Sequence, residues 1–335
     1  MGTGTARAFW VRTPGVGEIR EEPLPPRGGD DVEVRTLYSG VSRGTETLVF
    51  RGEVPPDQYA RMRAPFQAGD FPAPVKYGYL TVGVIEAGPD VGATVFALHP
   101  HQTRYVLPRS AVVEVPPQVD PKRAVLAGTI ETAVNALWDT PPLVGDRVTV
   151  IGAGMVGCGL AAVVAKIPGV DVELVDVDEG KRPVVARLGV RFATPGQART
   201  GRDLVYHASA TQAGLRTALE VVRDEGTITE LSWYGDREVS LGLGGVFHSG
   251  RITIRSSQVG RVAPARRESR TYGDRLRIAL DLLKDPVFDA LLGGESPFEE
   301  LPQVMPRIAD GELPMCHVIT YDHIADDDIA DDEGE

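Results

Sequence analysis

The stretch VTVIGAGMVGCGLAA, residues 148–162, joins an apolar β-branched run to a run of small apolar residues through the pattern Gly-x-Gly-x-x-Gly. This order predicts a strand, a tight turn and a helix. Gly152 would make the turn, Gly154 would let the backbone approach a pyrophosphate, and Gly157 would let the helix pack closely on the sheet. The phosphates would lie at the helix N-terminus, where unpaired N–H groups and the helix dipole favour anions. The candidate cofactor-binding residues of this turn are Gly152, Gly154, Met155, Val156 and Gly157.

A second strand, VELVD at 172–176, ends in Asp176, which lies 19 residues after Gly157. A carboxylate at this place accepts hydrogen bonds from the adenosine ribose hydroxyls and repels a 2′-phosphate. Asp176 therefore predicts NAD rather than NADP, although Lys181 and Arg182 partly offset its charge. A glycine-rich turn that binds no ligand is the alternative interpretation.

The sequence patterns on either side of this unit divide the chain. Residues 1–121 contain short β-branched runs separated by Gly and Pro, which predicts a compact β-rich unit. Residues 122–261 alternate strand and helix patterns, which predicts a parallel, doubly wound sheet of the Rossmann kind and hence an α/β fold. One of its helices is expected at 211–226, TQAGLRTALEVVRDEG. Residues 262–325 are expected to return to the β-rich unit, and 326–335 form an acidic tail.

Composition excludes several classes of protein. The formal charge of −12 over 335 residues argues against a nucleic-acid partner, because the phosphate backbone would be repelled. No apolar run reaches the ~18 residues that a membrane span requires, and the N-terminus has no apolar signal core, so a cytoplasmic location without membrane contact is expected. Cys158 and Cys316 are too few for a disulfide framework and too far apart for a cysteine-rich zinc site.

A polar loop, SGVSRGTE at 39–46, follows a strand-like run near the N-terminus. It places Ser42, Arg43, Thr45 and Glu46 within five positions. Hydroxyls, a cation and a carboxylate gathered in this way are suited to handling protons. A solvated turn is the alternative, and Thr45 and Glu46 could equally cap the helix that TETLVF begins.

With its β-rich first part, its late Rossmann unit and its C-terminal return, the chain resembles the medium-chain dehydrogenase/reductase superfamily up to about residue 325. The resemblance implies a GroES-like catalytic domain, an NAD-binding domain and a substrate cleft between them. In zinc alcohol dehydrogenases of this superfamily the polar loop reads Ser-Gly-Ile-Cys-Gly-Ser-Asp or close to it, one residue shorter than here. Ser42 then stands in place of the first metal-binding Cys, and Thr45 and Glu46 match the proton-relay hydroxyl and the following acid.

The other zinc ligands of that superfamily are also replaced. In YGYLTVGVIEAG, Tyr79 stands where the family has the metal-binding His and Leu80 where it has Glu, and Gly128 occupies the third ligand position. The lobe with four cysteines that binds structural zinc has no counterpart. His99, His101 and His248 remain as possible ligands, but no third ligand accompanies the His99 and His101 pair, so no metal is expected.

These observations predict a zinc-independent, NAD-dependent oxidoreductase that interconverts a secondary alcohol and a ketone. Tyr79 and Thr45 are the expected hydrogen-bond donors to the oxygen that gains charge, with Ser42 beside them and Glu46 or His99 as a relay. Tyr79 filling the volume left by zinc is the structural alternative.

The resemblance also implies that Ser232 and Trp233 line the nicotinamide pocket, and that the strand in 247–260 forms a sheet edge through which a homodimer could assemble. The expected partner is otherwise a small-molecule alcohol or carbonyl compound. Two further functions stay open: a metal-free reductase of a conjugated C=C bond or quinone, and a dinucleotide-binding protein without catalysis.

Overall fold

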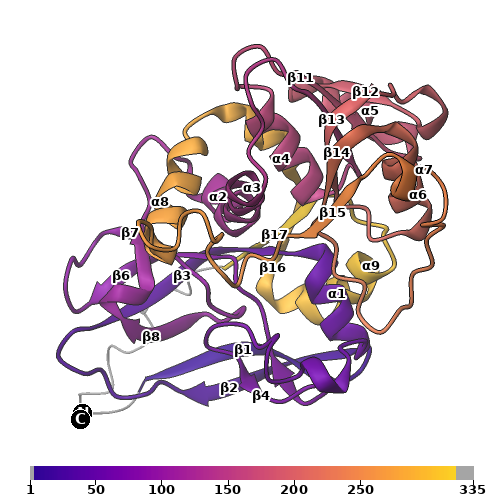
Figure 1. The fold of residues 1–335 in the computed structure, drawn as a ribbon. Coiled ribbons are helices and arrows are strands. Elements are labelled where there is room, and N and C mark those ends of the chain that lie inside the picture. The colour runs from indigo at the N-terminus through magenta and orange to yellow at the C-terminus, as the bar shows by residue number, and fades with distance from the viewer. Residues whose placement is uncertain (1–3, 322–335) are drawn as a thin grey trace, which may run out of the picture.

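The computed structural model describes residues 4–321 and contains a six-stranded parallel sheet in the second half of the chain (Figure 1). The strand order is β12-β11-β10-β13-β14-β15. Successive strands of the chain are added on one side of β10 up to β12 and on the other side from β13 onward. Open α/β sheets bind ligands at the carboxyl ends of the strands where this change of side occurs, here between β10 and β13. The strands are β10 (Arg147–Ile151), β11 (Asp171–Val175), β12 (Arg191–Ala193), β13 (Arg202–His207), β14 (Val222–Glu230) and β15 (Thr253–Ser256).

Helices cover both faces of this sheet (Figure 1). Helix α8 packs on α3 and lies next to the β-rich part (Figure 1). The helices of the described chain are α1 (Arg43–Arg51), α2 (Pro121–Ala124), α3 (Ala127–Asp139), α4 (Met155–Val164), α5 (Arg182–Arg187), α6 (Gln212–Val221), α7 (Val246–Ser249), α8 (Tyr272–Leu282) and α9 (Leu301–Ala309).

The β-rich part consists of two sheets, and the C-terminal segment completes the larger one. This seven-stranded sheet has the order β16-β17-β3-β6-β7-β9, with β8 paired to β3, and the smaller sheet has the order β2-β1-β5-β4. Residues 292–320 thus lie beside strands from the first 41 residues (Figure 1). The strands are β1 (Thr5–Thr13), β2 (Val16–Pro23), β3 (Asp31–Val41), β4 (Ala68–Gly69), β5 (Val75–Lys76), β6 (Thr81–Ala87), β7 (Thr94–Ala97), β8 (Arg104–Pro108), β9 (Val112–Glu114), β16 (Leu292–Pro297) and β17 (Cys316–Thr320).

One hydrophobic core connects the two parts of the molecule. Leu80, just before β6, and Phe96 of β7 belong to the same buried cluster as Ile130 of α3 and Leu160 of α4. The small residues of α4 allow close packing here, because a Cβ on Gly159 would lie 2.9 Å from Ile130 Cδ1. The β-rich part and the Rossmann part are therefore packed against each other through a shared core.

One sequence-based expectation falls differently in the structure, and another lies outside the described residues. The helix expected at 211–226 is α6, and it ends at Val221, where β14 begins at Val222. The β-branched pair at this point favours extended backbone, and pairing with β13 outweighs the helical spacing of the preceding residues. The acidic tail at 326–335 lies outside the described residues. Within 4–321, no helix combines the length and apolar character needed to cross a membrane.

Candidate active site

The glycine turn after β10 has the geometry of a backbone cradle. Gly152 has φ +104°, and a Cβ there would lie 2.7 Å from the backbone nitrogen of Ser209. A Cβ on Gly157 would lie 1.9 Å from the carbonyl oxygen of Gly152, so α4 can approach the turn only without a side chain. A Cβ on Gly154, the N-cap of α4, would meet nothing within 4 Å. The turn therefore offers open space at the N-terminus of α4, as an anionic phosphate group requires.

Asp176 follows β11 directly and is held beside this turn. Its Oδ2 atom accepts hydrogen bonds from the backbone nitrogen of Ala153 at 2.6 Å and from Lys181 Nζ at 3.0 Å, and its Oδ1 atom accepts from the nitrogen of Asp178 at 2.9 Å. The carboxylate is thus fixed beside the glycine turn, at the carboxyl end of β11. Lys181 neutralises part of its charge, which weakens the repulsion that a 2′-phosphate would meet.

The stretch 39–46, expected as a polar loop, is the end of β3 and the start of α1, with only Ser42 between the two elements. It contains a buried carboxylate. Glu46 lies in the first turn of α1, where its Oε1 atom accepts a hydrogen bond of 2.7 Å from the nitrogen of Ser42. Its Oε2 atom accepts a hydrogen bond of 2.8 Å from His101 Nε2. His101 Nδ1 in turn lies 2.6 Å from Ser39 Oγ, which is 2.8 Å from the hydroxyl of Tyr321. Glu46 is therefore no solvated turn residue, since it ends a buried chain of hydrogen bonds.

The histidine beside Glu46 is His101 and not His99. His99 is stacked on Tyr105, with ring centroids 4.1 Å apart, and on Phe66. Burial lowers the pKa of His99 to about 3, so the ring is neutral. The ring of His99, the expected relay, is thus stacked against aromatic residues, and the histidine hydrogen-bonded to Glu46 is His101.

Tyr79 and Ser42 are brought together by the fold. The Tyr79 hydroxyl donates a hydrogen bond of 2.7 Å to Ser42 Oγ. Burial raises the pKa of Tyr79 to about 12, and the negative charge of Glu46 adds to the shift, while hydrogen bonds with Ser42 and Thr45 oppose it. Tyr79 is therefore a neutral hydrogen-bond donor at physiological pH.

Gly128, which the resemblance implies as the third zinc-ligand position, also lies beside Tyr79. A Cβ on Gly128, in α3, would be 2.5 Å from Leu80 Cδ2 and 3.8 Å from Tyr79 Cδ2. Ser42, Tyr79 and Gly128 thus meet in space as the resemblance implied. Across residues 4–321, no three His, Cys, Asp or Glu side chains are grouped to hold a metal ion, and His248 is exposed on α7.

Ser232 and Trp233 lie on the segment that follows β14 and leads to α7. Ser232 Oγ accepts a hydrogen bond of 3.0 Å from the nitrogen of Ala210, and Trp233 packs against the hydrophobic cluster of the β-rich part. A Cβ on Gly235 would lie 3.0 Å from Leu48 Cδ2 in α1. The segment therefore connects the carboxyl edge of the parallel sheet with the helix that begins beside Ser42.

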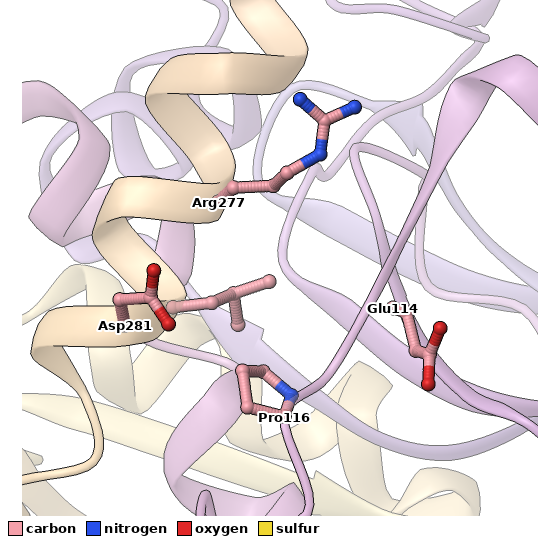
Figure 2. Close-up of a pocket in the computed structure, with 5 residues that line it drawn as sticks. Glu114, Pro116, Arg277 and Asp281 are labelled. Carbon is pink, nitrogen blue, oxygen red and sulfur yellow. The ribbon is translucent and has the colours of Figure 1, made fainter.

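A groove elsewhere on the molecule has no connection with these residues. It has a volume of about 230 Å³ and lies between α8 and the chain after β9 (Figure 2). Its lining residues are Glu114, Pro116, Arg277, Leu280 and Asp281, none of which belongs to the glycine turn or the polar loop.

Comparisons with known proteins show the fold. No protein-family model and no curated protein sequence matches the chain. L-idonate 5-dehydrogenase from Escherichia coli superposes with a TM-score of 0.78 at 15% identity, over 95% of this chain and 98% of that chain. Acetophenone reductase from Geotrichum candidum, solved with NAD, gives 0.75 at 17% identity, over 94% and 97%. A protein from Sinorhizobium meliloti described as a zinc-binding dehydrogenase, solved with NADP, gives 0.76 at 15%, over 95% and 99%.

The fold class predicted from the sequence is confirmed. The chain has a Rossmann sheet combined with a GroES-like β-rich part, and it shares this architecture with the dehydrogenase structures named above. Identities this low establish the fold alone, and function has to be argued from the site.

Proposed function

We propose that this protein is a nicotinamide-dinucleotide-dependent oxidoreductase that interconverts a secondary alcohol and a ketone without zinc. The observation that carries the proposal is the hydrogen bond between Tyr79 and Ser42, at two of the positions that hold zinc in related alcohol dehydrogenases. Neighbouring structures described as dehydrogenases and a ketone reductase support the reaction class.

The glycine turn fits the proposed cofactor. Gly154 leaves open space at the start of α4, and Gly152 and Gly157 allow the tight turn around it. When bound, the nicotinamide ring supplies or accepts the hydride. The candidate cofactor-binding residues Met155, Val156, Ser232 and Trp233 are assigned to the same site, the first two at the start of α4 and the last two beyond β14.

Tyr79 and Thr45 take over the task that a metal would perform at the substrate oxygen. As a ketone is reduced, its oxygen gains negative charge, and hydrogen bonds from preorganised donors stabilise that charge. Tyr79 is neutral and retains its proton, so it can donate. The single O–H of Tyr79 donates to Ser42 Oγ, so on substrate binding it would turn from Ser42 to the ketone oxygen, while Glu46 orients the start of α1.

NAD is the cofactor that we propose, because Asp176 lies at the end of β11 with a fixed carboxylate. The neighbouring structures include complexes with NAD and with NADP, and Lys181 reduces the local negative charge. The preference for NAD is accordingly expected to be moderate.

The domain bounds, the dimer contact and the location are proposed from the sequence patterns and the family resemblance. Residues 1–121 and 262–325 form the GroES-like catalytic domain, and 122–261 the cofactor domain. The exposed edge strand β15 is the proposed contact of a homodimer, and the location is cytoplasmic. The loop SGVSRGTE and the Gly-Tyr pair at Tyr79 also resemble 3-hydroxyethyl bacteriochlorophyllide a dehydrogenase, a likeness limited to these two short motifs.

Reduction of a conjugated C=C bond or a quinone is the second candidate. The same neutral donors would stabilise an enolate or phenolate oxygen, and Tyr79 gives this candidate its support. A panel of secondary alcohols, ketones, enones and quinones, followed by NADH absorbance at one fixed pH, separates the two reactions. Turnover of ketones alone supports the leading proposal, and turnover of enones or quinones alone supports the second. Binding of NADH without turnover of any panel compound would indicate a dinucleotide-binding protein instead.

A further inference from the structure

A second buried polar cluster lies at the carboxyl ends of β13 and β14. His207 is the last residue of β13 and has no exposed surface. Its Nδ1 atom is 2.7 Å from Glu230 Oε2, and its Nε2 atom is 2.7 Å from Ser209 Oγ. A carboxylate, an imidazole and a hydroxyl are thus connected in series, away from Tyr79 and the polar loop.

Glu230 is the acceptor at one end of this series. It receives hydrogen bonds from His207 Nδ1, from the hydroxyl of Tyr234 at 3.0 Å and from the nitrogen of Ser232 at 2.7 Å. Burial alone would raise the pKa of Glu230, but the hydrogen bonds from His207 and Ser232 hold it below its ordinary value. Burial and the charge of Glu230 raise the pKa of Tyr234, which remains a donor. His207 therefore carries its proton on Nδ1.

The other end of the series consists of hydroxyl groups. Thr211 Oγ1 accepts a hydrogen bond from the nitrogen of Gly214, as the N-cap of α6, and lies 2.9 Å from Ser209 Oγ. Thr211 can then donate to Ser209, and Ser209 donates to His207 Nε2. All the hydroxyl hydrogens point toward Glu230, which leaves Ser209 Oγ with a free lone pair and no free hydrogen.

Ser209 lies at the point where the strand order reverses. Its backbone nitrogen is 2.7 Å from the position of a Cβ on Gly152, so it adjoins the glycine turn. Asp176 lies on the opposite side of β10, at the end of β11. A dinucleotide placed across this crevice has its adenosine ribose near Asp176 and its other ribose on the side of β13 and β14.

We propose that Glu230 and His207 are positioning residues that present Ser209 Oγ as a hydrogen-bond acceptor to a hydroxyl of the nicotinamide-side ribose. This inference rests on the proposed binding of a nicotinamide dinucleotide. Ser209 Oγ, as a hydrogen-bond acceptor, can bind a ribose hydroxyl, because that group donates a hydrogen bond. It disfavours a phosphate oxygen, because that atom has no hydrogen to donate. The polar series thus separates the ribose subsite from the phosphate subsite at Gly154.

The test compares three ligands that occupy different parts of the crevice. NADH and ADP-ribose contain the second ribose, whereas AMP contains only the adenosine end. Ser209→Ala should weaken binding of NADH and ADP-ribose about fivefold, the effect of one lost neutral hydrogen bond, and leave AMP binding unchanged. His207→Asn removes the acceptor for Ser209 and should act in the same direction. His317→Asn is the matched control, because His317 forms a similar pair with Ser296 in the seven-stranded sheet, 2.9 Å apart.

A second readout is the tautomer of His207, measured by ¹⁵N NMR of histidine-labelled wild-type protein. The expected signal is that of a neutral ring protonated on Nδ1. A ring protonated on Nε2, or on both nitrogens, overturns the inference, and this measurement does not depend on the folding of any variant.

The binding data can also overturn it. If Ser209→Ala and His317→Asn have the same affinity for NADH, the hydrogen-bonded series is structural and the inference is wrong. The same conclusion follows if Ser209→Ala loses as much affinity for AMP as for NADH. Failure of the wild-type protein to bind NADH, ADP-ribose and AMP alike would instead refute the proposed function itself.

Discussion

The hydroxyl of Tyr79 donates a hydrogen bond of 2.7 Å to Ser42 Oγ, which joins β-rich segments 37 residues apart in sequence. The resemblance to zinc alcohol dehydrogenases implies that both residues stand at zinc-ligand positions, and Gly128, implied at the third such position, lies against Leu80. On the proposed function, the site would have a neutral hydrogen-bond donor where a Lewis acid lies in those enzymes.

Tyr79→Phe keeps the ring and removes only the hydroxyl, so it separates catalysis from cavity filling. If Tyr79 stabilises the oxygen that becomes negative, its loss should lower kcat about 10²-fold, and Thr45→Val should have a smaller effect in the same direction. Steady-state kinetics on the best substrate of the panel measures both variants. NADH binding should be unchanged. Near wild-type kcat in both variants would make the loop structural.

The pH dependence of ketone reduction should not show ionisation of Tyr79 in the neutral range. Burial and Glu46 raise the pKa of Tyr79 to about 12, so the phenol stays protonated and able to donate as the pH rises from neutrality. We expect no loss of kcat from this group up to about pH 10. The pH profile of the wild-type enzyme should match that of Tyr79→Phe in shape. A limb near pH 8 or 9 that disappears in Tyr79→Phe would contradict the assignment.

Gly154 and Gly157 should respond differently to alanine. A Cβ on Gly154 meets nothing within 4 Å, so Gly154→Ala should fold normally but weaken NADH binding about tenfold by occupying the space of the phosphates. A Cβ on Gly157 would lie 1.9 Å from the backbone of Gly152, so Gly157→Ala should lose about 3 kcal/mol of unfolding free energy. Thermal unfolding and fluorescence titration distinguish the two variants. Equal behaviour of both would refute the geometry of the turn.

Asp176 should control the choice between NADH and NADPH. Asp176→Ser removes the carboxylate that repels a 2′-phosphate and should narrow the preference for NADH by roughly 1–2 kcal/mol. Because this change also removes the hydrogen bond to Ala153, the two cofactors are compared on the same variant by tryptophan fluorescence. Asp178→Ser is the control, since the Asp178 side chain accepts from Gly180 instead. Tighter NADPH binding by the wild-type protein would refute the prediction.

Purified protein should contain no stoichiometric zinc. Ser42, Tyr79 and Gly128 offer at best two hydroxyl oxygens at the three ligand positions, and zinc sites in proteins use thiolate, imidazole or carboxylate ligands. Elemental analysis measures the content, and a chelator should leave activity unchanged. One zinc per chain, or chelator-sensitive activity that zinc restores, would disprove zinc independence.

The failed expectation at 211–226 shows the limit of local patterns. Helical spacing there was correct up to Val221, but the following residues pair with β13 and form β14. Apolar residues such as Val222 satisfy either periodicity over a short run, so the sequence alone does not place the boundary. Only the neighbouring strand decides it, by offering backbone partners.

The sequence by itself determined the strand, turn and helix around Gly152, because a tight turn, a close helix and a free approach to backbone each require glycine at a set position. It also placed Ser42, Tyr79 and Gly128, none of which is a usual zinc ligand, at the positions where the family resemblance implies zinc ligands. The tertiary structure alone decided which polar groups meet. Glu46 and His101 are 55 residues apart, and Ser39 and Tyr321 are 282 apart. Such pairs depend on strand order and register between distant segments, which no local periodicity encodes.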